Sequence, residues 1–167
     1  MKKFLQTNFC RLFSTNSFTK QIQMSLPGRV TADELAELVR NKNRKPGVDY
    51  LIIDVRDEDY KVGHIPGAIN IPAHEIRERA NGLVQQYSSV PMLVFHCALS
   101  QVRGPKSARI YKEAATEALT TAEPSSPLFN QAVNVLTGGF TSWVYRFRDT
   151  EPELITEFDA ELWDEEL

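Results

Sequence analysis

Residues 91–105 read PMLVFHCALSQVRGP, and three structural signals follow one another within this stretch. Pro91 to Phe95 is a short apolar run, which predicts a strand buried on both faces of a sheet. His96 and Cys97 end that run, and five residues separate Cys97 from Arg103. Gly104-Pro105 favours the start of a helix, because proline in the first turn lacks only an N–H that would be unpaired there. The stretch therefore predicts a strand, a loop and a helix, with Cys97 at the carboxyl end of the strand.

The flanking sequence continues the alternation of helices and strands. Thr31 and Glu34 form a capping box that predicts a helix start. Apolar runs predict further strands over residues 50–55, 68–71 and 132–136, and helices are expected over about 74–87, from 104 onward and after Gly138-Gly139. This alternation predicts an α/β fold with a parallel sheet flanked by helices. At 167 residues the chain has room for one such domain.

The beginning of the chain differs in composition from the rest. Residues 1–32 contain no acidic residue, and an amphipathic basic start of this kind resembles a mitochondrial presequence. The alternative is a leader that is bypassed when synthesis starts at Met24. The first alternative predicts a mitochondrial protein, and the second predicts a protein of the cytoplasm and nucleus. We therefore divide the chain into an extension (1–27), a domain (28–148) and a tail (149–167).

The tail is strongly acidic. Residues 151–167 hold eight Asp or Glu residues and no Lys or Arg. Apolar residues recur among these charges at positions 154, 155, 158, 162 and 163. Their spacing predicts an amphipathic helix that either packs back on the domain or docks a partner.

Composition argues against several classes of partner. The net charge is −3 and no basic cluster suggests nucleic-acid binding. No apolar run approaches the roughly 20 residues of a membrane helix. Cys10 and Cys97 do not form a disulfide framework, and residues 104–167 contain neither Cys nor His, so we expect no metal site. We expect a monomer.

The loop between Cys97 and Arg103 has the composition of an anion site with a nucleophile at its base. Five residues curled around an anion can direct successive backbone N–H groups inward, and the following helix adds the positive end of its dipole. Arg103 offers a planar fork for two oxygens of a tetrahedral oxyanion. The same positive field favours the thiolate of Cys97, which is the nucleophilic form. The expected binding residues are Ala98, Leu99, Ser100, Gln101, Val102 and Arg103.

Three motifs resemble the rhodanese superfamily over residues 28–148. They are Asp54-Val-Arg56 followed by GHIPGAIN (63–70), the Cys97 loop, and GGFTSW (138–143). Within that superfamily, HCALSQVRGPKSA (96–108) resembles the M-phase inducer phosphatases and the small arsenate reductases. Sulfurtransferases of this fold usually carry a loop one residue shorter. The longer loop here makes room for phosphate or arsenate.

The resemblance implies a protein phosphatase of the tyrosine or dual-specificity type, acting on a phosphoprotein through a phosphocysteine on Cys97. His96 is expected to brace the loop. Asp54 is expected to hold neighbouring loops together, with Arg56 as its ionic partner. The hydroxyl of Ser100 either points into the loop or belongs to a turn residue, and both alternatives stay open. Because the loop contains no acidic residue, no general acid is assigned.

Arsenate reduction is the alternative activity. The same loop would bind arsenate, and Cys97 would form an adduct that an external thiol, glutathione or glutaredoxin, resolves, since the domain has no second cysteine. No other cofactor is expected. Sulfur transfer is less favoured because of the loop length. An inactive binding module is also less favoured, because it would have no reason to keep both Cys97 and Arg103.

Overall fold

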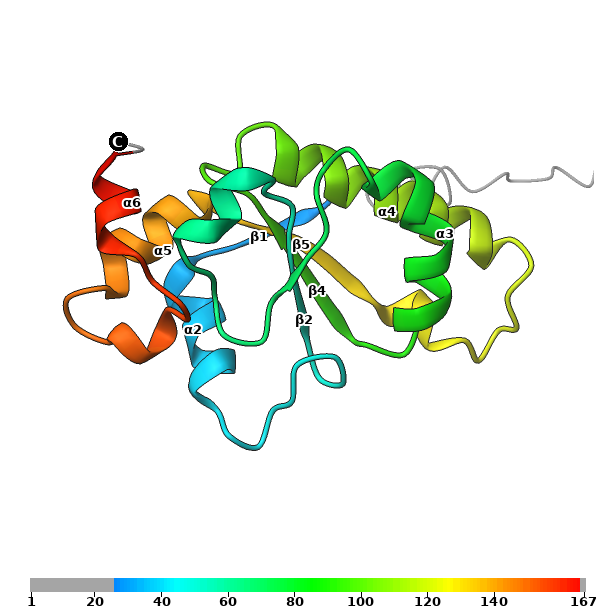
Figure 1. Ribbon diagram of the computed structural model, residues 1–167. Coiled ribbons are helices and arrows are strands. Elements are labelled where there is room, and N and C mark those ends of the chain that lie inside the picture. Colours follow the sequence, from blue (N-terminus) through cyan, green and yellow to red (C-terminus); the bar gives the residue numbers. More distant parts are fainter. Residues whose placement is uncertain (1–25, 166–167) are drawn as a thin grey trace, which may run out of the picture.

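The computed structural model describes residues 26–165 (Figure 1). Nearly all of the predicted extension (1–27) lies outside the described residues. The presequence, the bypassed leader and the localisation that each implies therefore stay predictions. Within the described part of the chain, no helix is long and apolar enough to cross a membrane. No group of three or more His, Cys, Asp or Glu side chains in that part could hold a metal ion.

A five-stranded parallel sheet forms the centre of the domain, in the order β1-β5-β4-β2-β3. This confirms the predicted α/β fold with a parallel sheet flanked by helices. The strands are β1 (Gly28–Val30), β2 (Leu51–Asp54), β3 (Ile69–Asn70), β4 (Met92–His96) and β5 (Ala132–Leu136). The helices are α2 (Ala32–Arg40), α3 (Ile76–Tyr87), α4 (Arg103–Leu119), α5 (Gly139–Phe147) and α6 (Ala160–Glu165). Short 3-10 helices are η1 (Glu58–Val62), η2 (Pro127–Asn130) and η3 (Pro152–Leu154).

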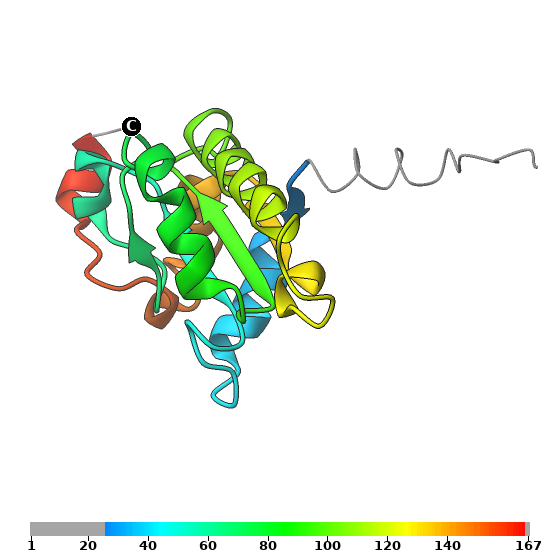
Figure 2. The same cartoon turned by 90° about the vertical axis from the view of Figure 1, so that its right-hand side faces the viewer.

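Helices cover both faces of the sheet, which explains why the central strands are apolar along their whole length. On one face Ile53 and Phe95 pack against α3 and α4, which lie side by side in Figure 2. On the other face Ile52 and Val94 pack with residues of α2 and α5. Successive strand residues therefore serve two separate cores. The sheet is held rigidly between them, which fixes the positions of its strand ends.

The parallel topology brings the functional motifs to one edge of the sheet. The strands end at Asp54, His96 and Leu136, and β4 lies between β2 and β5. Asp54 is directly beside His96 in the register of β2 and β4. Loops that follow the carboxyl ends of such strands are where α/β proteins bind ligands. The three motifs that resemble the rhodanese superfamily meet at this edge.

The structure differs from the sequence-based prediction at three elements. The strand β1 was not predicted, because its three residues carry no apolar run. Helix α3 begins at Ile76 and not at about His74. The prediction of one amphipathic helix in the tail is wrong: the backbone of Thr156 forms an antiparallel bridge with His64, through hydrogen bonds of 2.9 and 2.8 Å. That bridge separates η3 from α6.

The tail packs back on the domain, which was one of the two alternatives. Trp163 is 5% exposed and its ring lies edge-on to those of Phe140 and Tyr145 in α5. The N–H of Asp159 donates to the carbonyl of Val62 in η1. The tail is therefore attached both to α5 and to η1, and both of these elements border the Cys97 loop.

Candidate active site

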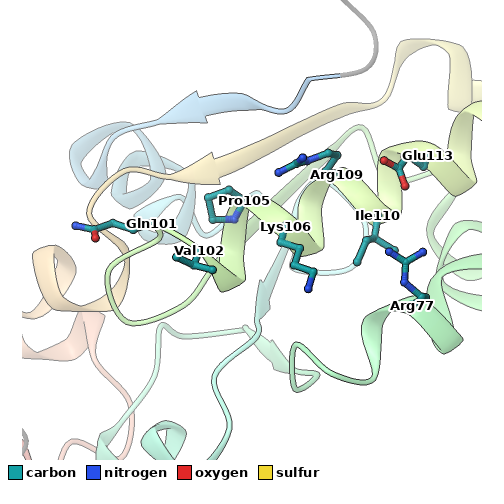
Figure 3. Close-up of a pocket in the computed structure, with 8 residues that line it drawn as sticks. All are labelled: Arg77, Gln101, Val102, Pro105, Lys106, Arg109, Ile110 and Glu113. Carbon is teal, nitrogen blue, oxygen red and sulfur yellow. The ribbon is translucent and has the colours of Figure 1, made fainter.

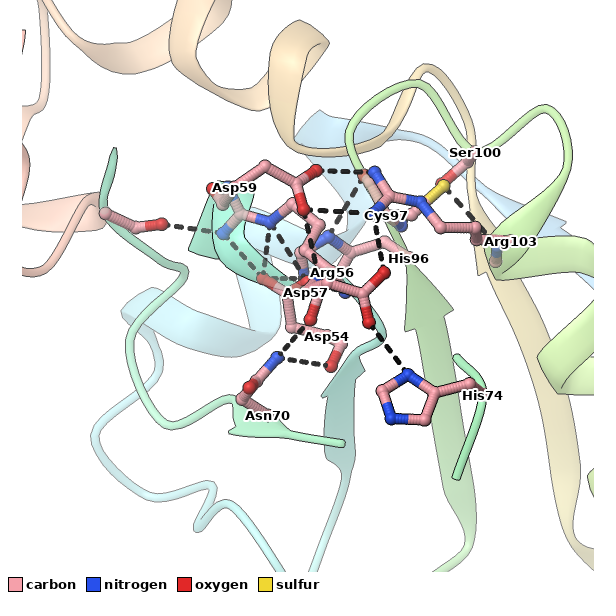
Figure 4. A network of polar contacts seen from close by, with 12 residues as sticks. Asp54, Arg56, Asp57, Asp59, Asn70, His74, His96, Cys97, Ser100 and Arg103 are labelled. Carbon is pink, nitrogen blue, oxygen red and sulfur yellow. Dashed lines mark hydrogen bonds and ion pairs between the residues drawn. The ribbon is translucent and has the colours of Figure 1, made fainter. Parts of the chain in front are cut away.

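Cys97 lies directly after β4, at the base of the loop that leads into α4 (Figure 4). Its side chain is 4% exposed. The Sγ atom accepts a hydrogen bond of 3.4 Å from the N–H of Gly104, in the first turn of α4. That first turn contains no acidic residue. The sulfur is therefore held at the positive end of the α4 dipole.

The N–H groups of the loop are arranged to receive an anion. The carbonyls of Cys97 and Ala98 accept hydrogen bonds of 2.9 and 3.0 Å from the N–H groups of Phe140 and Thr141 at the start of α5. Across a trans peptide the C=O and the next N–H point in opposite directions, so the N–H groups of Ala98 and Leu99 point away from α5. Within residues 26–165, none of the N–H groups from 98 to 102 donates to another protein group. Successive free N–H groups of this kind form an anion-binding nest.

Glycine at position 139 permits this contact between α5 and the loop. Gly139 has φ = 61°, and a Cβ there would collide with the carbonyls of Cys97 and Ala98. No other residue type combines that backbone conformation with so close an approach. The GGF motif is thus a device for positioning the Cys97 loop.

Ser100 has both of the features that the sequence left open. Its φ is 51°, so it occupies the tight left-handed turn of the loop. Its hydroxyl also accepts a hydrogen bond of 3.4 Å from the N–H of Cys97, and the residue is 2% exposed. Ser100 therefore connects the middle of the loop to its first residue, Cys97. In contrast, Leu99 and Val102 are 51% and 71% exposed and form the rim.

Asp54 and Arg56 form the buried ion pair that the sequence predicted, with Nη2 of Arg56 2.6 Å from Oδ2 of Asp54. Arg56 also donates to the carbonyls of Asp59 and Gly63, at 2.9 and 2.6 Å. Its guanidinium lies 3.9 Å from the centre of the Phe140 ring. A buried ion pair is costly unless the remaining donors of its members are satisfied, and the two carbonyls accept from Nη1 and Nη2 of Arg56. Arg56 thereby fixes η1 against the loops that follow β2 and β5.

His96 is fully buried, behind the loop and not in it. Its Nδ1 lies 3.4 Å from the Cys97 carbonyl and its Nε2 lies 3.5 Å from Asp54. Burial is the main cause that lowers the pKa of His96, and the charge of Asp54 opposes it only in part. The neutral imidazole fits a bracing role better than proton transfer with solvent.

The guanidinium of Arg103 is held by two carboxylates of η1 and its N-cap that the sequence did not identify. Its Nη1 lies 2.9 Å from Oδ1 of Asp59, Nη2 contacts Oδ2 of the same residue, and Asp57 lies 3.3 Å away (Figure 4). Burial raises the pKa of Asp59, but its hydrogen bonds with Arg103 and the charge of Arg103 outweigh that cause, so the net pKa is lowered. The hydrogen bond with Asp59 is the largest cause that raises the pKa of Arg103. Asp59 therefore occupies the Nη1–Nη2 edge of the guanidinium, whereas the Nε–H of Arg103 donates to no group within residues 26–165 and leaves the Nε–Nη2 edge for an oxyanion.

The structure thus brings Cys97, Arg103, His96, Asp54 and Arg56 together as the sequence indicated. Sequence reasoning missed Asp57 and Asp59, although the run Asp57-Glu58-Asp59 is visible directly after Arg56. Asp59 also lines a cavity of about 230 Å³ beside the loop, together with Ala98, Leu99, Phe140, Thr141 and Trp163. This cavity is bordered by the tail, whose part in the site no motif signalled.

Comparisons with known proteins agree with this geometry. The chain matches the family model of the rhodanese-like domain over residues 31–146. It is 35% identical to the dual specificity phosphatase ibp1 of Schizosaccharomyces pombe, over 58% of this chain and 75% of that protein. It is 34% identical to arsenate reductase 2.2 of Oryza sativa subsp. japonica, over 68% of this chain and 79% of that protein. The solved structure of an As-Sb reductase from Leishmania major superposes with a TM-score of 0.60 at 29% identity, covering 81% of this chain and 89% of that one.

Proposed function

This chain belongs to the rhodanese-like domain family, and the relatives that it resembles include a dual-specificity phosphatase and arsenate reductases. We propose that it is a cysteine-dependent protein phosphatase. The observation that carries the proposal is the run of N–H groups from 98 to 102 that donate to no group within residues 26–165, in the loop that begins at the buried Cys97. A nest of this kind suits a tetrahedral oxyanion, and the buried sulfur at its base suits attack on the atom at the centre of that anion.

The proposed reaction has two steps. The thiolate of Cys97 attacks phosphorus opposite the leaving oxygen, so that a P–S bond forms, the P–O bond breaks and the leaving oxygen takes up a proton. Water then attacks phosphorus, the P–S bond breaks and inorganic phosphate is released. In both steps the loop N–H groups and Arg103 would stabilise the charge on the three equatorial oxygens.

The supporting residues act by position. The pair Asp54–Arg56 holds η1 in place, and His96 fills the space behind the loop. Phe140 and Thr141 bind the loop carbonyls and so aim the first N–H groups of the nest. Preorganised donors of this kind need no rearrangement when charge develops, which is the main source of catalysis in phosphoryl transfer.

Arsenate reduction is the second candidate, and the likeness to the As-Sb reductase supports it. Arsenate would condense with the Cys97 thiol and lose water. Attack by an external thiol such as glutathione would then release arsenite, reducing arsenic by two electrons and joining the two sulfurs in a mixed disulfide. A second thiol, from glutathione or glutaredoxin, would restore Cys97. Cys97 is the one cysteine among residues 26–165, so the described part of the chain supplies no resolving thiol.

A direct comparison of the two activities tests the proposal. The full chain is assayed for hydrolysis of an aryl phosphate and, in parallel, for arsenite formation with glutathione and glutaredoxin, with Cys97→Ser as the blank. Phosphate release that the blank lacks, without comparable arsenite formation, is the expected result. Arsenite formation as the dominant Cys97-dependent reaction would replace the phosphatase by the reductase. A wild-type rate in Cys97→Ser would refute both.

A further inference from the structure

A second cavity of about 350 Å³ adjoins the Cys97 loop on the side of α3 and α4 (Figure 3). Gln101 and Val102 contribute from the loop, so the cavity begins where the anion site ends. Its other lining residues include Arg77 of α3 and Lys106 and Arg109 of α4. We call this cavity the α3–α4 groove. No step of the proposed reaction uses it.

The α3–α4 groove carries excess positive charge. The side chains of Arg77, Lys106 and Arg109 are exposed, and none of them forms an ion pair within residues 26–165. Glu113 is the single acidic residue in the lining. By contrast, Arg79 on the same helix as Arg77 lies 3.0 Å from Glu75 and is neutralised there. The lining therefore holds three cations and one carboxylate, an excess of two positive charges in a protein whose net charge is −3.

The opposite side of the loop is acidic. Its first residues, Ala98 and Leu99, share the 230 Å³ cavity with Asp59 and with Trp163 of α6. Asp57 and Asp59 are paired with Arg103, but Glu58 lies between them in sequence and α6 adds Glu161 and Asp164 on either side of Trp163. An extended chain crossing the loop therefore meets negative charge on one side of the nucleophile and positive charge on the other. That asymmetry gives a bound peptide a preferred direction.

We propose that the α3–α4 groove binds acidic side chains of the protein substrate, on one side of the phosphorylated residue. This inference rests on the proposed phosphatase function and specifies its substrate class. Lys106 and Arg109 follow Arg103 by three and six residues, or roughly 4.5 and 9 Å along α4. An extended peptide advances about 3.3 Å per residue, so the acidic residues belong about one to three positions from the phosphorylated one.

Matched phosphotyrosine peptides test this selectivity with the full chain. One peptide carries Glu at the first to third positions before the phosphotyrosine, one carries Glu at the same positions after it, and the third has Gln at all of these positions. Each exposed ion pair contributes about 0.2–1 kcal/mol, which is roughly 1.4- to 5-fold. We expect kcat/KM to favour one of the acidic peptides by about 5- to 10-fold over the neutral peptide. We expect this ratio to fall as salt shortens the range of exposed charges.

Two variants locate the effect. The double variant Arg77→Gln/Arg109→Gln removes two groove cations and is expected to reduce the acidic-to-neutral ratio to within about 2-fold of unity. Arg79→Gln removes one positive charge from α3 outside the groove and is expected to keep the wild-type ratio. Equal rates for the three peptides with the wild-type chain would overturn the inference. A preference that survives in the double variant would overturn it as well.

A binding measurement separates this inference from the proposed function. Fluorescence anisotropy with Cys97→Ser compares the affinities of the three peptides without any turnover, and it should show the same order and the same loss in the combined Cys97→Ser/Arg77→Gln/Arg109→Gln variant. If Cys97-dependent hydrolysis of aryl phosphate is absent, the phosphatase proposal fails. Equal affinities of Cys97→Ser for the three peptides would, independently of turnover, reject the binding of acidic side chains in the α3–α4 groove. If Arg77→Gln/Arg109→Gln instead raises the KM for glutathione in arsenate reduction while the peptides bind equally, the groove serves that acidic thiol and the inference is wrong.

Discussion

At the scale of single residues, the positive charge of Arg103 is shared between two anionic partners. Asp59 binds it in the structure, and the oxyanion must bind it in the proposed reaction. Since Arg103 holds the pKa of Asp59 below its ordinary value of about 3.9, this carboxylate stays ionised through neutral pH. The negative charge of Asp59 therefore opposes the binding of an anionic substrate at neutral pH.

Neutralising Asp59 should strengthen anion binding. In Asp59→Asn the charge that opposes oxyanion binding at Arg103 is gone, and we expect the inhibition constant for inorganic phosphate to fall by about 2- to 5-fold, the range of one partly exposed ion pair. Steady-state inhibition of aryl-phosphate hydrolysis measures it. Glu58→Gln, which changes the same charge at an exposed neighbour, should leave the constant unchanged. A higher inhibition constant in Asp59→Asn would mean that Asp59 orients Arg103 and does not oppose oxyanion binding.

The sequence predicted some of these residues and not others for a physical reason. Cys97 and Arg103 share one short loop, so their spacing alone indicated an anion site. Asp54 and Arg56 were linked by their motif. Asp59 belongs to an acidic run that also fits a solvated surface, and its position depends on Arg56 binding the carbonyls of Asp59 and Gly63 across the site. Contacts of this kind have no local sequence signal.

At the scale of elements, strong local patterns predicted the structure and weak ones did not. The apolar run before Cys97 and the Gly104-Pro105 start located β4 and α4, and the capping box of Thr31 and Glu34 located α2. The tail failed as a single helix although its apolar spacing was helical. Backbone pairing between His64 and Thr156 competes with helix formation there, and tertiary hydrogen bonds prevail over local propensity.

Helix α6 should contribute to stability mainly through Trp163. Trp163→Ala removes a large ring packed on Phe140 and Tyr145, and we expect the free energy of unfolding to fall by about 3 kcal/mol. The indole Nε1 is buried and has no hydrogen-bond partner within residues 26–165, so Trp163→Phe, which removes that N–H and keeps a ring, should cost less than about 1 kcal/mol. Chemical denaturation of the full-chain variants measures both.

A matched control makes the stability experiment specific. Leu162 is its neighbour in α6 and is 39% exposed, so Leu162→Ala should change the free energy of unfolding by less than about 1 kcal/mol. If Trp163→Ala unfolds at the wild-type denaturant concentration, the tail does not pack on the domain in solution. A cost for Trp163→Phe as large as that for Trp163→Ala would mean that the indole N–H is paired.

At the scale of the whole molecule, the alternation of strands and helices was enough to predict a parallel sheet covered on both faces. That topology alone brings the ends of β2, β4 and β5 to one edge, so the meeting of the three motifs followed from the fold class. The distribution of charge around that edge did not follow from the fold class. Arg77 and Arg109 are 32 positions apart in sequence but line one groove, because α3 packs against α4.

The most direct measurement asks whether the phosphoryl group passes through Cys97. The full chain, in molar excess, is mixed with an aryl phosphate, and the first turnover is quenched within milliseconds. The quenched protein is then digested and its peptides are mapped by mass spectrometry. We predict a phosphoryl group on the sulfur of Cys97 that appears before inorganic phosphate and disappears as phosphate is released. Turnover that proceeds with no phosphoryl group on Cys97, or with the group on another residue, would contradict the covalent mechanism.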